Sequence, residues 1–149
     1  MNEVKVGFGH HLIYFFCWLI AMVLGFLDLV SVRELILSVF ALIDLDLKVV
    51  GLLDKLGFFG FGVIGLTVII LTEGYFRSGV SSGNLFERVC LIFGVQLLCL
   101  FVFEGGRLVI PGIVDVARPS IIPTVMNLTI GLLCLAVWRR KCQIRLGGL

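Results

Sequence analysis

The feature that most constrains this chain is a run of 17 residues, Leu56–Thr72, without a charged side chain. A helix of that length rises about 25 Å, close to the thickness of a bilayer's hydrocarbon core. The run contains GFGVIG, Gly60–Gly65, which fits the G-x-G-x-x-G pattern of dinucleotide-binding loops. That pattern needs a preceding strand and glycines in a loop at the edge of a helix. Here the glycines lie inside an apolar run, so we interpret the run as a membrane-spanning helix.

The composition of the whole chain points the same way. Sixty per cent of the residues are hydrophobic and 15% are charged, and the mean hydropathy is +1.16. A soluble domain has about 25% charged and roughly 45–50% apolar residues. We therefore expect residues 1–149 to form a single polytopic membrane domain whose partners are the bilayer and other integral membrane subunits, not nucleic acid. The N-terminus has one basic residue, Lys5, and no small-residue cleavage pattern, so we expect no cleaved signal peptide.

Four apolar segments have the length of a spanning helix, about 17–25 residues. They cover roughly residues 11–30, 56–72, 85–103 and 121–138. The predicted fold class is therefore an all-α membrane protein with four transmembrane helices. Asp28 falls near one end of the first of these segments.

The segment 31–55, between the first and second predicted spans, mixes leucines with charged residues. Leu35–Ile43 is too short to cross a bilayer. From Leu45 onward the pattern predicts an amphipathic helix lying along the membrane surface. Such a segment either caps the bundle or offers a docking surface to a partner. The segment that joins the second and third predicted spans, Glu73–Arg88, is rich in glycine and serine and predicts a turn-rich connector.

The distribution of Lys and Arg predicts the orientation of the spans. With four spans, the side that holds both termini has seven basic and three acidic residues, and the opposite side has five basic and seven acidic residues. The cluster Trp138–Lys141 sharpens this bias. We expect both termini in the cytoplasm and the chain in the inner (plasma) membrane of a bacterium.

Small and polar residues within the spans predict helix packing. Gly57, Gly60 and Gly65 fall on one side of the second span, and small residues let helix backbones approach closely. Gln96 in the third span and Asn127 in the fourth are candidates for hydrogen bonds between helices. We therefore expect the third and fourth helices to be neighbours.

The predicted spans contain no group of residues typical of an active site. No Asp, Glu, Lys, Arg or His falls near the middle of a predicted span, where transporters and intramembrane enzymes keep ionisable groups. The cysteines form no C-x-x-C pair, so we expect small apolar side chains rather than a disulfide framework or a metal site. They are Cys17, Cys90, Cys99, Cys134 and Cys142. We expect no catalytic residues and no enzyme activity.

His10 and His11 are the two histidines of the chain and lie where the first span enters the membrane. Imidazole ligates haem iron and, by chemical analogy, the magnesium of chlorophyll or bacteriochlorophyll. One hypothesis is therefore an axial ligand to such a cofactor. The other is a polar pair that anchors the end of the helix at the interface, with no cofactor.

Three functions are compatible with these patterns. We expect a non-catalytic accessory or structural subunit of a larger integral membrane complex, because short loops join spans without an active-site group. The second hypothesis is a membrane component of a transporter for an apolar solute or lipid that needs no buried charge. The third is a pigment- or haem-binding subunit that uses His10 or His11.

Overall fold

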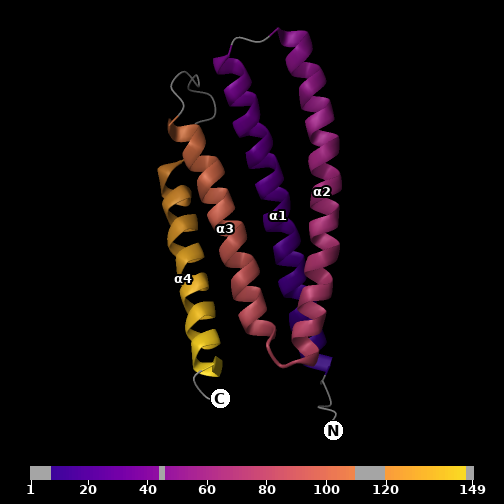
Figure 1. The fold of residues 1–149 in the computed structure, drawn as a ribbon, viewed down its shortest axis with the longest axis vertical. Helices are drawn as coiled ribbons and strands as arrows, with labels where there is room; N and C mark the ends of the chain where they lie inside the picture. The colour runs from indigo at the N-terminus through magenta and orange to yellow at the C-terminus, as the bar shows by residue number, and fades with distance from the viewer. Residues whose placement is uncertain (1–7, 44–45, 110–119, 147–149) are drawn as a thin grey trace.

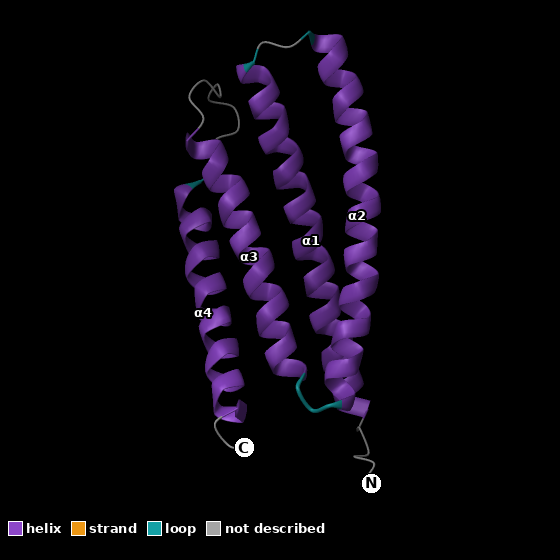
Figure 2. Ribbon diagram, viewed as in Figure 1, coloured by secondary structure: helices purple, strands orange, loops and turns teal. Residues whose placement is uncertain are grey.

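The regular structure of the described part of the chain is entirely α-helical (Figure 2). The computed structural model describes residues 8–43, 46–109 and 120–146. Its four helices are α1 Phe8–Leu42, α2 Leu47–Ser81, α3 Leu85–Val109 and α4 Ile121–Leu146. All four are long and apolar enough to cross a membrane. The predicted fold class, an all-α protein with four transmembrane helices, is confirmed.

Consecutive helices run antiparallel, so the start of α1 and the end of α4 lie at the same end of the molecule (Figure 1). Helices α1, α2 and α3 all contact one another. Within the described residues, α4 packs against α3 alone. The fold is thus a group of three helices with the fourth attached to one side.

The helices differ in length in a way that the sequence did not predict. Helices α1 and α2 have 35 residues each, about 52 Å, whereas α3 has 25 and α4 has 26, about 38 Å. A hydrocarbon core is about 30 Å thick. The end of α1 at Leu42 and the start of α2 at Leu47 therefore extend beyond the end of α3 (Figure 1).

This extension replaces the separate amphipathic segment predicted at 31–55. Residues 31–42 continue α1 and residues 47–55 belong to α2. Both helices include charged residues of this segment because these residues pair with each other. Arg33 of α1 donates two hydrogen bonds, both 2.8 Å, to the carboxylate of Asp54 of α2. Arg33, which follows the predicted first span, and Asp54, which precedes the predicted second span, thus join two helices.

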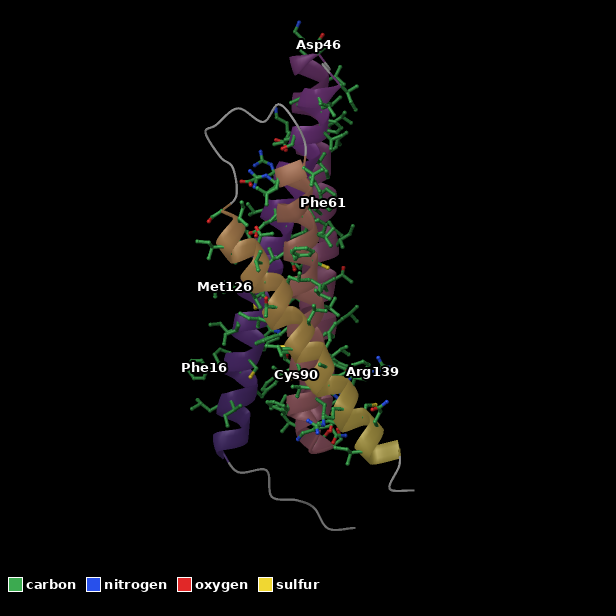
Figure 3. The ribbon with its side chains drawn as sticks, turned by 90° about the vertical axis from the view of Figure 1, so that its left-hand side faces the viewer. Phe16, Asp46, Phe61, Cys90, Met126 and Arg139 are labelled. Atoms are coloured by element: carbon green, nitrogen blue, oxygen red, sulfur yellow. The ribbon has the colours of Figure 1, made fainter. Side chains whose placement is uncertain are left out.

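Both ends of α2 are capped. The Asp46 carboxylate accepts a hydrogen bond from the backbone N–H of Lys48, and Asp46 lies at the tip of the molecule (Figure 3). At the other end Gly83 has φ +69°, the N–H of Asn84 donates to the carbonyl of Gly79, and the N–H of Gly83 donates to that of Val80. This pair of bonds is a Schellman motif, which needs a residue in the left-handed region after the helix.

The connector predicted at Glu73–Arg88 is therefore much shorter than expected. Its first nine residues belong to α2, and the turn between α2 and α3 is residues 82–84. Phe76, in this helical part, is fully buried. Arg88, in the first turn of α3, donates to the carbonyl of Tyr75 at 2.6 Å, and its guanidinium lies 4.6 Å from the centre of the Tyr75 ring. These contacts bind the end of α2 to the start of α3.

Most large apolar side chains lie on the outside of the molecule. Phe58 and Phe59 of α2 are 68% and 75% exposed. Phe16 projects from α1 away from the other helices (Figure 3). Four long apolar helices with such a surface belong in a lipid bilayer, so the chain is a multi-pass membrane protein.

Candidate functional site

A cavity of about 270 Å³ lies between α1, α2 and α3. Its walls come from Trp18 to Leu29 of α1, Ile64 to Thr72 of α2 and Val95 to Cys99 of α3. These segments are close to the middle of each helix, and most of their side chains are apolar. The cavity is thus an apolar space within the membrane-spanning part of the protein.

Three buried polar atoms on residues that line this cavity have no hydrogen-bond partner among the described residues. They are Nε1 of Trp18, Oδ1 of Asp28 and Oε1 of Gln96. A buried polar atom without a partner typically costs about 1–3 kcal/mol, so native proteins nearly always satisfy such atoms with protein, water or ligand. Residues that carry one unpartnered donor and two unpartnered acceptors therefore contribute to the walls of an apolar space that is large enough for a small molecule.

The orientation of the Gln96 amide follows from its contact with α1. Its Nε2 donates to the backbone carbonyl of Ala21 at 2.9 Å. Because that carbonyl accepts hydrogen bonds and does not donate them, the NH₂ group must be on the Ala21 side, which leaves Oε1 as the unpartnered acceptor. Gly25 gives the amide room, since a Cβ there would lie 3.2 Å from Nε2. Gln96, which was expected to join helices, joins α3 to α1.

Asp28 occupies a place that the sequence analysis did not predict. It lies twenty residues after Phe8 and fourteen before Leu42, in the middle part of α1 rather than near one end. The expectation that no ionisable residue falls near the middle of a span is therefore wrong. The physical reason is the pairing of Arg33 and Asp54, which allows α1 to continue past the charges that suggested its end.

A belt of polar contacts joins the helices on the side of the cavity nearer Asp28. Arg33 binds Asp54 between α1 and α2, and Glu34 binds Arg107 between α1 and α3. Between α3 and α4, Glu104 accepts hydrogen bonds from Thr124 Oγ1 at 3.2 Å and Asn127 Nδ2 at 3.3 Å. Of the described side chains that line the cavity, none is Lys, Arg or His.

The glycines singled out in the sequence lie in different surroundings. Gly65 lines the cavity, and a Cβ added there would lie 2.7 Å from Leu29 Cδ1 of α1. A Cβ at Gly57 would meet its own helix at Phe61, and one at Gly60 would meet open space.

Two further glycines, Gly94 and Gly131, bring the backbones of α3 and α4 close together. A Cβ on Gly94 of α3 would lie 3.2 Å from the carbonyl oxygen of Gly131 of α4, and one on Gly131 would lie 3.3 Å from that of Gly94. Their position at the centre of two predicted neighbouring spans was an available signal for a close contact.

The other candidate ligands lie apart from this cavity or outside the described side chains. The five cysteines are free thiols, and Cys99 alone among them lines the cavity. The described residues contain no cluster of three His, Cys, Asp or Glu side chains that would hold a metal ion. His10 and His11 lie in the first turn of α1, and their side chains fall outside the described part. A haem or chlorophyll ligand at these positions stays a prediction.

Comparison with models of protein families, with curated proteins and with solved structures finds no match. The cavity and the three unpartnered polar atoms of its lining residues are the features of the described chain that bear on its function.

Proposed function

We propose that this chain is the solute-binding membrane component of a transporter, and that the solute is small and largely apolar with one polar end. The observation that carries the proposal is the cavity between α1, α2 and α3 with three unpartnered polar atoms. Ligand sites are typically apolar cavities with a few convergent polar groups. The proposal keeps the predicted transport of an apolar solute but adds a polar group to that solute.

The place and size of the cavity support this function. Transporters bind their substrates near the middle of the bilayer, and this cavity lies near the middle of three spanning helices. An engineered apolar cavity of about 150 Å³ holds benzene. A cavity of about 270 Å³ therefore has room for a molecule larger than benzene.

Binding is measurable through Trp18, which lines the cavity. Replacing the other tryptophan, Trp138→Phe on α4, leaves Trp18 as the single fluorescent indole. In that background we expect butylbenzene to change the Trp18 emission in a saturable way. The additional change Val68→Phe, which fills the cavity, should abolish the effect, whereas Leu66→Phe on the exposed face of α2 should preserve it. An effect that grows without saturation, or that survives Val68→Phe, would refute the proposal.

Transport itself is measured with the purified chain in liposomes. We expect the chain to accelerate uptake of a cavity-binding solute, and Val68→Phe to remove the acceleration. If the solute binds but its uptake is no faster than through protein-free liposomes, the chain is a binding protein and not a transport component.

A second candidate, an accessory subunit of a larger membrane complex, is favoured by the extension of α1 and α2. Leu42 at the end of α1 is 59% exposed and Ile43, directly after it, is 61% exposed. Leu52 and Leu56 of α2 are 60% and 61% exposed. Because 35-residue helices exceed the hydrocarbon thickness, these apolar side chains gain from burial against another integral membrane protein. Purification in mild detergent tests this: Leu52→Glu together with Leu56→Glu should release a stoichiometric partner if this surface binds it.

We also propose that the end with the basic cluster faces the cytoplasm. The start of α1, the turn between α2 and α3, and the end of α4 lie together (Figure 1), and this end holds Arg139, Arg140 and Lys141. We expect a membrane-impermeant thiol reagent to label Cys142 after the cells are opened and not before. Labelling in intact cells would reverse the orientation and argue against a cytoplasmic C-terminus in a bacterial inner membrane.

A further inference from the structure

We infer that the cavity between α1, α2 and α3 binds a small lipophilic ammonium ion, with its charged head at Asp28 and its apolar body toward Trp18. The inference rests on the proposed function, since it assigns the chemical class of the solute. It depends on the two hydrogen-bond acceptors among the unpartnered atoms and on the absence of a cationic side chain from the described walls of the cavity.

The Asp28 carboxyl group is the main argument. A carboxyl group within hydrocarbon is costly unless a cation pairs with its ionised form, and such residues typically mark sites for substrates or ions. The nearest part of the polar belt does not supply that cation, because Arg33 is bonded to Asp54 and Arg107 to Glu34. A ligand with a positive charge supplies what these described contacts do not.

The neighbouring groups also favour a ligand that donates hydrogen bonds. Oε1 of Gln96 is a second acceptor whose direction is fixed by the bond from Nε2 to Ala21. The hydroxyl of Thr72 donates to the carbonyl of Val68 at 2.7 Å, so it is already used within α2. An ammonium group, with up to three N–H donors, matches two acceptors better than a carboxylate or phosphate head, which Asp28 would repel.

The far end of the cavity suits the apolar body of such a ligand. Trp18 lies ten residues from Asp28 on α1, about 15 Å along the helix. Between them the walls are formed mainly by apolar side chains such as Met22, Phe26 and Ile69. A ligand with one charged end and a hydrocarbon body therefore places its head at Asp28 and its body against the apolar side chains between Asp28 and Trp18.

The inference is tested with two probes of the same shape. In 3-phenylpropylammonium and butylbenzene, an NH₃⁺ group and a CH₃ group occupy the same position. Both are titrated against the full-length Trp138→Phe protein, and against the same protein with Asp28→Asn, by Trp18 fluorescence. Asp28→Asn removes the charge and nearly preserves the volume. We expect Asp28→Asn to weaken the binding of 3-phenylpropylammonium about 10- to 100-fold, the loss typical of a hydrogen bond to a charged group. The binding of butylbenzene should weaken less than about twofold.

The outcomes separate this inference from the function on which it rests. If butylbenzene binds the protein with Asp28 and the ammonium does not, the cavity is a solute site but the solute is not a cation. If Asp28→Asn weakens both probes equally, the carboxylate does not recognise the charge, and the inference is again overturned. If neither probe binds the protein with Asp28, the proposed function fails and the inference fails with it.

Discussion

The pair α3–α4 and the pair α1–α2 use their glycines in opposite ways. Between α3 and α4, Gly94 and Gly131 bring the two backbones together, and a Cβ on Gly94 would lie 2.8 Å from Leu135 Cγ. Between α1 and α2, Gly65 meets the end of the Leu29 side chain, and a cavity opens beside this contact. One pair is closed at its centre, and the other leaves space there.

The difference indicates how a small membrane protein combines rigidity with a site. In lipid no hydrophobic force drives helices together, so close packing and polar contacts must hold them. The α3–α4 pair has both, since the polar contact of Glu104 with Thr124 and Asn127 supplements the glycine contact. The α1–α2 pair is joined by the exposed ion pair of Arg33 and Asp54 outside the cavity. In the proposed function, α3–α4 is the support and the space between α1, α2 and α3 is the solute site.

The largest expected effect comes from filling the α3–α4 contact. Gly94→Leu should destabilise the protein by about 3 kcal/mol, the upper end of typical overpacking costs, because backbone atoms of Gly131 cannot move aside as a side chain can. Thermal unfolding in detergent measures this. The matched control is Gly60→Leu on α2, where a Cβ meets nothing within 4 Å. Equal stability of the two variants would show that α3 and α4 are not closely packed at Gly94.

A smaller effect is expected at the polar contact of the same pair. Asn127→Leu removes the hydrogen bond to Glu104 and should cost about 0.6–2 kcal/mol, as for other polar contacts between membrane helices. The control is Thr129→Val, because the Thr129 hydroxyl donates to Val125 within α4 and joins no second helix. Unfolding in mixed detergent micelles compares the two. A larger loss from Thr129→Val would place the α3–α4 contact on a different face of α4.

The smallest effect is expected at Gly65. Gly65→Ala adds a methyl group against the end of Leu29, a flexible side chain beside a cavity, and should cost less than about 1 kcal/mol. Gly94→Ala, which meets Leu135 and the Gly131 backbone, should cost more. The comparison of the two alanine variants by thermal unfolding is the sharpest test of an open and a closed helix pair. A larger loss of stability from Gly65→Ala than from Gly94→Ala would contradict the contrast between an open and a closed helix pair.

The sequence was sufficient for the four helices because each contains a long apolar run, and Leu56–Thr72 indicated the second of them directly. It was not sufficient for their ends. A charge at Arg33 or Glu34 suggests the end of a span unless its partner is known, and those partners, Asp54 and Arg107, are distant in sequence.

The site was missed for the same reason. With α1 ending at Val30, Asp28 is expected at the interface; with α1 ending at Leu42, it lies in the middle part of the helix. Gln96 was recognised as a residue that joins helices, but its partner on α1 depends on which helix lies beside α3. A one-dimensional pattern of polarity contains no information on that neighbour.

The central claim is that the space between α1, α2 and α3, next to Trp18, binds a small molecule. The two tryptophans report on different regions, since Trp18 lines the cavity and Trp138 lies on α4. The measurement is the pair of indole ¹H–¹⁵N NMR signals of the full-length protein during a titration with butylbenzene. The account predicts that the Trp18 signal shifts saturably, because the probe's ring lies beside it, and that the Trp138 signal stays in place. Parallel shifts of both signals, or a Trp18 signal that does not move, would contradict the account.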